Sequence, residues 1–317
     1  MQTYRKIRFA FITVVIIIGV LILSDQSTGE RVSYSFTPTG EVHNLRIDIA
    51  STDVTIVQGN EFKVDGKDLY KDGYRIEMDG DTLVVETGKQ DYFVLHLGLF
   101  EKEEKITITV PSSFQFDKID VSVGSGDVTS RIELLSNQID IIAGSGDVNL
   151  KEVVNSNSSI SVGSGTVAIS DIQSESTDVS VGSGDIDIDY IESGKAALSV
   201  GSGDIFFKSL TSNECSLDTG SGDIEGSGLE VTRMETEVGS GSIDLKGIIN
   251  GESSFECGSG DIDLRLKGNK DDYSFHIDGD DVEINGDSYQ DDFKSDTKLD
   301  KHLNLSVDSG SIHVVIK

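Results

Sequence analysis

The stretch VSVGSGDIDI, residues 179–188, returns as LSVGSGDIFF at residues 198–207, nineteen positions further along the chain. The first glycine of this Gly-Ser-Gly segment recurs with one step of 20 residues and six steps of 19, at positions 124, 144, 163, 182, 201, 220, 239 and 258. So regular a period is typical of stacked units, none of which can bury its apolar face alone.

Apolar and polar residues alternate on both sides of this glycine-rich segment. The residues one and three positions before its first glycine are mostly Val, Ile or Leu, and the residue between them is mostly Ser, Asp or Glu. Further apolar columns follow the segment, and the last of them contains Val153, Ile172, Ile191, Leu210, Leu229 and Ile248. This alternation predicts strands with one buried face. The inward parity changes across Gly-Ser-Gly-Asp, which predicts a bend where glycine provides positive φ or close backbone approach.

These patterns predict an all-β fold. We expect a single-stranded parallel β-helix, or β-solenoid, right-handed, with about 19 residues per coil. Degenerate copies of the motif at 45–56, 74–85, 273–284 and 303–314 extend the array in both directions. We assign residues 40–317 to the solenoid, with regular coils at 119–284, an insertion loop at 285–302 and a terminal coil at 303–317. Roughly a dozen coils, stacked in chain order, would stand about 55 Å tall.

The N-terminus predicts a membrane anchor. A basic flank at 1–8 precedes an unbroken apolar run at 9–24, FAFITVVIIIGVLILS. The run is short for a transmembrane helix, but Ile7 and a snorkelling Arg8 extend it. The basic flank places the N-terminus in the cytoplasm, so the linker at 25–39 and the solenoid are expected on the extracytoplasmic side of the cell membrane. The alternative is a cleaved signal peptide, but LILSDQS offers no convincing small-x-small cleavage site.

The charge of the chain limits its partners. The formal net charge is −30, from 56 acidic and 26 basic side chains. Nucleic acid and anionic lipid headgroups are therefore poor partners, because like charge repels them. Apart from the membrane itself, bound through the N-terminal helix, the expected partners are a cell-envelope component, a protein or a cationic peptide.

The two cysteines, Cys215 and Cys257, both fall in inward columns of the predicted coils. Two coils separate them, which corresponds to about 9.6 Å along the solenoid axis. A disulfide requires Cα atoms less than about 7 Å apart. We therefore predict two free, buried thiols.

Arrays of VGSGDIxI at this spacing behind a signal anchor resemble the putative-adhesin family of bacterial envelope proteins, a family of unknown function. The resemblance covers nearly all of the predicted exported region, and the departures are the blurred coils at 60–115 and the insertion at 285–302. It implies a β-solenoid at the cell envelope and no catalytic residues. Several members of that family lie in Lia-type operons, which respond to antibiotic damage of the Gram-positive envelope, so the resemblance also implies a role in envelope stress.

One acidic column runs along the predicted corners and contains Asp127, Asp147, Asp185, Asp204, Asp223 and Asp261. Calcium-binding nonapeptide repeats also place Gly-x-Gly before Asp, but they recur about every nine residues. The alternative is structural: each carboxylate accepts hydrogen bonds from N–H groups of its own corner, as in an Asx turn. Thr166, Ser242 and Ser311 replace Asp in three coils, and a hydroxyl fits a turn better than a calcium site.

A second calcium candidate has spacing that echoes an EF-hand loop. Its ligands would be Asp281, Glu283, Asn285, Asp287 and Asp292, with a glycine at position 286. Against it, the repeat makes 281–284 a strand, and Asp at the last position lacks the reach of the usual bidentate Glu. The three carboxylates of Asp185, Asp187 and Asp189 are about 6.6 Å apart along one strand face, too far for one ion.

The sequence offers no catalytic constellation. The five histidines share no metal-ligand spacing, and the corner serines repeat in every coil rather than occurring once in a nucleophile motif. We therefore expect no enzyme and no cofactor other than calcium. The predicted function is an adhesin-like or envelope-stress-related binding or scaffold protein. The alternatives are a calcium-stabilised structural spacer on the cell surface and a polysaccharide-processing β-helix.

Overall fold

A computed structural model describes residues 30–88, 104–289, 293–295 and 297–317. In these residues one 24-stranded sheet winds into a solenoid, and the only helical segment of the described ranges is the 3-10 turn η1 (Lys270–Asp272). The all-β prediction is confirmed. The predicted anchor at 9–24 lies outside the described residues. Among those described, no helix has the length and apolar character to span a bilayer.

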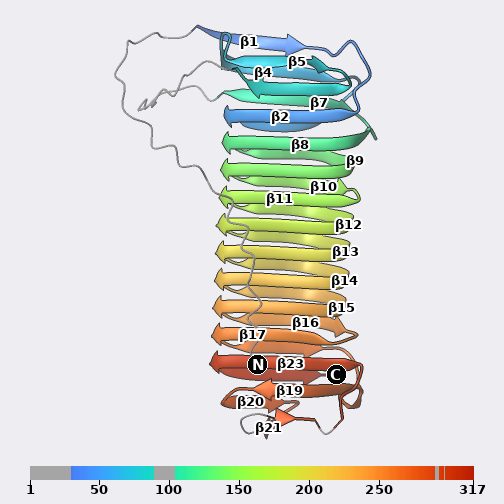
Figure 1. Cartoon of the computed structure of the whole chain (residues 1–317), viewed down its shortest axis with the longest axis vertical. Helices are drawn as coiled ribbons and strands as arrows, with labels where there is room; N and C mark the ends of the chain where they lie inside the picture. Colours follow the sequence, from blue (N-terminus) through green and yellow to red (C-terminus); the bar gives the residue numbers. More distant parts are fainter. Residues whose placement is uncertain (1–29, 89–103, 290–292, 296) are drawn as a thin grey trace, which may run out of the picture.

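The regular part of the solenoid forms the middle of the molecule (Figure 1). Its strands are β8 (Gln115–Ser125), β9 (Val128–Ser145), β10 (Val148–Val154), β11 (Asn157–Ser164), β12 (Val167–Ser183), β13 (Ile186–Ser202), β14 (Ile205–Ser221), β15 (Ile224–Ser240), β16 (Ile243–Ile249), β17 (Ser253–Ser259) and β18 (Ile262–Leu266). Neighbouring coils are parallel and in register, so that Ile186 lies opposite Val167 on one side and Ile205 on the other. The sequence period is therefore the coil length.

The inward columns form one continuous apolar core. Ile186, Ile205, Ile224 and Ile243 stack along a single column, and each is fully buried. Complete burial of one such side chain stabilises the fold by about 1.5–3 kcal/mol. Phe207 compensates for the missing side chain of the next coil, since a Cβ on Gly226 would lie 2.0 Å from its ring. The apolar alternation of the sequence thus corresponds to the core.

Ile248, in the last of the predicted apolar columns, is placed differently. The register of β15 against β16 shifts by one residue between Ser227 and Leu229, where Gly228 has φ 95°. Gly247 consequently lies opposite Leu229, and Ile248 lies opposite Glu230 and is only partly buried. The prediction of Ile248 as an inward residue is wrong, because the shift moves its side chain out of the column.

Both glycines of each corner are required by close backbone approach. Gly203 has φ 135°, and a Cβ added to it would lie 2.2 Å from the carbonyl oxygen of Gly184 in the preceding coil. A Cβ on Gly201 would lie 2.5 Å from the carbonyl oxygen of Gly182. The predicted corner is confirmed. Its second glycine, such as Gly203, has both a positive φ and a close backbone neighbour, the two reasons expected for glycine.

The corner carboxylates bind the next coil rather than their own turn. Asp185 Oδ1 accepts from the amide of Asp204 at 2.9 Å, and Asp204 Oδ1 accepts from the amide of Asp223 at 2.7 Å. The same bond runs from Asp127 to Asp147, from Asp147 to Thr166, from Asp223 to Ser242 and from Asp261 to Ser311. The predicted Asx turn is therefore wrong, because the equivalent amide one interstrand spacing away is within reach of a short side chain.

A hydroxyl can take the same place in this column. Ser242 Oγ accepts from the amide of Asp261 at 3.3 Å, a longer bond than those to the carboxylates. At the end of the column, Asp261 Oδ1 accepts from both the amide and the hydroxyl of Ser311, and these hydrogen bonds lower the pKa of the Asp261 carboxyl. The column is thus a line of hydrogen bonds between coils.

The N-terminal end does not follow chain order. Its strands are β1 (Arg31–Phe36), β2 (Asn44–Ser51), β3 (Asp53–Gly59), β4 (Lys63–Tyr70), β5 (Tyr74–Asp79), β6 (Thr82–Thr87) and β7 (Lys105–Pro111). The coil of β2 and β3 lies between the regular array, through β8 and β9, and an outer coil of β6 and β7. Antiparallel β5 covers β6, antiparallel β4 covers β7, and β1 lies outside β4.

The C-terminal end has the same exchange of order. Its strands are β19 (Tyr273–Asp278), β20 (Asp281–Ile284), β21 (Asp287–Tyr289), β22 (Phe293–Lys294), β23 (Lys301–Ser309) and β24 (Ser311–Ile316). The coil of β23 and β24 is inserted between β17 and β18 on one side and β19 and β20 on the other. The expectation that coils stack in chain order is therefore wrong at both ends. Short strands of the predicted insertion loop, β21 and β22, pair antiparallel with the outermost coil, as the exposed edge of a sheet requires.

We predict that Gly203→Ala destabilises the protein by about 3 kcal/mol, because it combines a strained φ with a clash against backbone that cannot move aside. Urea unfolding followed by circular dichroism measures the change. Ser202→Ala at the exposed neighbouring position is the control and is expected to stay within about 0.5 kcal/mol of wild type. Equal stabilities for the two variants would contradict the account of the corner.

A second prediction concerns the hydrogen bonds between corners. Asp204→Ala removes the acceptor of the Asp223 amide and is expected to cost about 1 kcal/mol, as for a lost cap. Asp204→Ser keeps a short acceptor, as Ser242 does, and is expected to cost little. Thermal melts of both variants, with calcium and with chelator, measure these effects. If Ser is as damaging as Ala and chelator lowers the wild-type midpoint, the column binds metal instead.

Candidate binding surface

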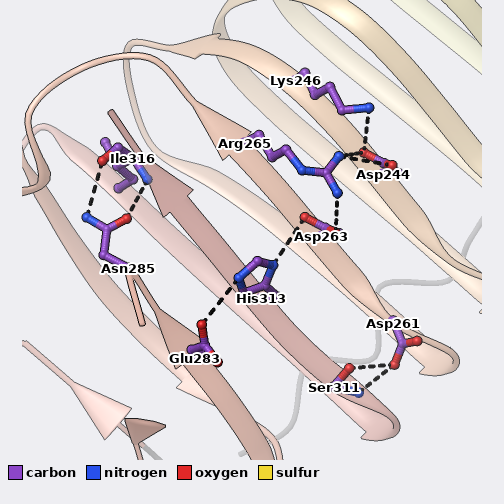
Figure 2. Close-up of polar contacts among 10 residues, drawn as sticks. All are labelled: Asp244, Lys246, Asp261, Asp263, Arg265, Glu283, Asn285, Ser311, His313 and Ile316. Atoms are coloured by element: carbon purple, nitrogen blue, oxygen red, sulfur yellow. Dashed lines mark hydrogen bonds and ion pairs between the residues drawn. The ribbon is translucent and has the colours of Figure 1, made fainter. Parts of the chain in front are cut away.

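The described residues of the EF-hand-like segment do not converge on one point. Asn285 Oδ1 accepts from the amide of Ile316 at 2.7 Å and its amide nitrogen donates to the carbonyl of Ile316, so that side chain joins two strands (Figure 2). Asp287 pairs with Lys270 at 3.4 Å. Asp292 lies outside the described residues. In the described part of the chain, no three His, Cys, Asp or Glu side chains are arranged to hold a metal, and calcium binding at 281–292 stays a prediction.

The two cysteines are free and buried, as predicted. Burial raises the pKa of the Cys215 thiol to about 12, and burial also raises the pKa of the Cys257 thiol. A thiol with a raised pKa is a poor nucleophile, because the thiolate is the reactive form. These side chains therefore belong to the core and offer no reactive group.

The histidines are dispersed over the solenoid, and one of the five, His96, lies outside the described residues. His302 is buried, with Nδ1 2.8 Å from Ser274 Oγ, and its pKa is lowered by burial. His313 is separate from it, between Asp263 and Glu283 (Figure 2). The rings of His302 and His313 thus serve different local contacts.

Four carboxylates form a surface that we call the acidic strip, consisting of Asp218, Glu235, Glu237 and Glu256. Asp218, Glu237 and Glu256 lie opposite one another on three successive coils, and Glu235 lies beside Glu237 on the same face. The three glutamates are exposed, and Asp218 is partly buried. Because the side chains project in the same direction from strands about 4.8 Å apart, like charges are brought close together.

Compensating cations for the acidic strip are absent among the described residues. Nearby basic side chains are engaged elsewhere: Lys195 and Arg233 with Glu214, and Lys298 with Glu252. Within the described ranges, none of the four strip carboxylates has a Lys, Arg or His within ion-pair distance. Burial, with added repulsion from Glu237 and Glu235, raises the pKa of the Asp218 carboxyl to about 6. The strip therefore carries negative charge that the fold itself disfavours.

In another outward column, basic side chains pair with the stacked carboxylates. On a different face, Arg265 Nη1 lies 2.8 Å from Asp244 and its Nη2 lies 2.6 Å from Asp263, and Lys246 also pairs with Asp244 (Figure 2). Upstream of the strip, the positions equivalent to Asp218 are the neutral Ser161, Ser180 and Ser199. The strip thus differs from both sets of positions, because its carboxylates stack and none of them has an ion-pair partner in the described part of the chain.

A shallow groove of about 380 Å³ adjoins the strip at Glu235. Its lining includes the short side chains Ala197 and Ser216 and the carboxylates of Asp178 and Glu214. Burial raises the pKa of the Asp178 carboxyl as well. Lys195 and Arg233 also line the groove, so it carries charges of both signs. Sequence reasoning missed the strip, although the positions between inward residues carry Asp218, Glu237 and Glu256 in succession and would have revealed it.

The solved structures similar to this chain include the following three, each with 90% of this chain covered. A protein described as a putative adhesin from Parabacteroides merdae is 12% identical, with 97% of that chain covered and a TM-score of 0.46. A putative adhesin from Bacteroides fragilis is 15% identical, with 96% covered and a TM-score of 0.38. A protein described as a putative lipid binding protein from Parabacteroides distasonis is 14% identical, with 98% covered and a TM-score of 0.41.

A search of curated proteins finds no match to this sequence. The Toastrack DUF4097 family matches residues 42–209 and 189–317, which together cover almost all of the solenoid. The match agrees with the resemblance noted from the repeated VGSGDI motif. The chain belongs to the Toastrack DUF4097 family.

Proposed function

We propose that this protein is an extracytoplasmic binding or scaffold protein, anchored in the cell membrane by residues 9–24, and that its acidic strip docks a cationic partner. The observation that carries the proposal is the stack of Asp218, Glu237 and Glu256 without cations. Adjacent like charges destabilise a folded sheet, and a partner that supplies positive charge relieves this repulsion.

The chemistry of the partner follows from the strip and the groove. Stacked carboxylates on a fairly flat strand face fit an extended chain with repeated Lys or Arg side chains, since successive cations can pair with successive coils. The net charge of −30 adds long-range attraction for such a chain. A basic peptide, or a basic segment of an envelope protein, is therefore the proposed ligand.

The proposed anchor also orients the solenoid. β1 lies at one end of the solenoid and β19 to β22 lie at the other (Figure 1). Residues 25–30 connect the apolar segment to β1, and six residues span at most about 20 Å. The β1 end would then stand near the membrane, with the acidic strip further out along the array. Such a position suits a protein that meets partners in the envelope.

Binding of a fluorescent dodecalysine peptide to the full chain in neutral detergent tests the acidic strip. The triple variant Asp218→Asn, Glu237→Gln, Glu256→Gln is expected to weaken binding on the order of tenfold, because it removes three exposed charge pairs. Lowering the pH from 7.5 to 5.5 is expected to weaken wild-type binding, because Asp218, whose pKa is raised to about 6, becomes protonated.

The matched control removes three carboxylates that already have cation partners: Glu77→Gln, Asp79→Asn and Glu86→Gln. Its net charge equals that of the strip variant. Binding by the control should stay close to wild type. If both variants lose affinity equally, the peptide responds only to net charge and the proposed strip is not a docking site.

The anchor is tested separately by topology. Protease added to intact cells is expected to remove the solenoid and leave a membrane-bound fragment that retains the N-terminus, because the basic flank at 1–8 keeps that end in the cytoplasm. An epitope tag at the N-terminus identifies the fragment on a blot. Recovery of the protein from the culture supernatant with a mature end near Asp25 would instead show a cleaved signal peptide.

A further inference from the structure

The C-terminal coil, β23 and β24, occupies a slot between two coils that precede it in the chain. β17 and β18 form one wall, and β19 and β20 form the other (Figure 1). The two walls are joined by residues 267–272, which include η1 and pass around the inserted coil. Both walls therefore lie earlier in the sequence than the coil between them.

The occupant is bound to both walls along its whole length. Toward β18, Ser311 donates to Asp261, and Lys317 exchanges backbone hydrogen bonds with Leu266 and Gly268. Toward β20, the Asn285 side chain bonds both backbone groups of Ile316 (Figure 2). His313 lies 3.5 Å from a carboxylate on each wall, Asp263 and Glu283. Its inward residues Leu303, Leu305, Val307, Ile312, Val314 and Ile316 are all buried.

These contacts do not depend on the occupant belonging to the same chain. Residues 285–300 connect the coil to β20, and a segment of this length can span up to about 55 Å. An identical coil from a second copy would make the same hydrogen bonds and bury the same side chains. The balance between the two arrangements then depends on protein concentration relative to the effective concentration set by the connection.

We propose that the slot between β17–β18 and β19–β20 is a strand-acceptor site, and that it takes the C-terminal coil of a second copy of this chain in place of its own. The reciprocal exchange produces a dimer in which each terminal coil completes the neighbouring solenoid. Copies anchored in one membrane are held at high local concentration, which favours this arrangement over the closed monomer.

Engineered disulfides between neighbouring coils distinguish the two arrangements. Ser259 and Ser309 are exposed and lie directly opposite on β17 and β23, so a Ser259→Cys, Ser309→Cys pair falls within disulfide reach. The background is Cys215→Ala, Cys257→Ala, since Ala196 and Ala143 occupy the same inward columns in other coils. The full-length variant is refolded in detergent under oxidising conditions and separated on non-reducing denaturing gels.

Strand exchange predicts covalent dimers whose fraction rises several-fold as the refolding concentration increases from about 10 µM to about 1 mM. The matched control is Ser240→Cys, Ser259→Cys, which joins consecutive coils of the regular array at the same corner position. It is expected to give only intrachain disulfides at every concentration. A second variant, Val307→Cys with the native Cys257 opposite it, repeats the test from the inward side of the same strands.

Dimers that exceed the control and depend on concentration would support the exchange. Intrachain disulfides alone, at all concentrations and in both variants, would overturn it. Failure of both pairs to oxidise while the control oxidises would also overturn it, because the terminal coil would then not lie against β17.

Discussion

Each residue of a coil lies opposite its equivalent in the next coil, about 4.8 Å away, so every column must tolerate its own repetition. Apolar columns satisfy this condition in the core, where Ile186 and its equivalents stack without gaps. Corner glycines satisfy it because no Cβ opposes the next backbone. A column of carboxylates satisfies it only when each charge has a donor or a cation, and the corner aspartates find their donor in the amide of the next coil.

The acidic strip does not meet this condition among the described residues. Asp244 and Asp263 are bridged by Arg265, whereas Asp218 and Glu237 face each other without a cation. Repulsion of this kind is a cost to stability, and it adds to burial, the main cause, in raising the pKa of the Asp218 carboxyl. Replacement by Ser, as at Ser199 one coil earlier, would remove the cost with little change in shape. This repulsion is the cost that the proposed cationic partner would offset.

Much of the fold could be predicted from the period of 19 residues, because a strict period with alternating burial has few other physical solutions. The inward columns, the corner glycines and the free cysteines all followed from it. The one-residue shift at Gly228, which displaces Ile248, could not be predicted, because the 19-residue period does not show where within a coil the register shifts. The donor to each corner carboxylate was predicted wrongly, because an amide in the same turn and an amide in the next coil are both within reach of the carboxylate. The acidic strip could have been found from the residues between the inward columns.

The order of the end coils could not be predicted from the sequence, because two segments share the same pattern. Residues 273–284 and 303–314 carry the same alternation, so either segment is compatible with the open face of β17 and β18. Sequence pattern alone therefore does not decide which of them stacks there. Strand exchange does not need this degeneracy, because a second copy presents the identical segment to the acceptor. The contacts that each segment makes with both of its neighbours, rather than its place in the sequence, therefore decide the order of the end coils.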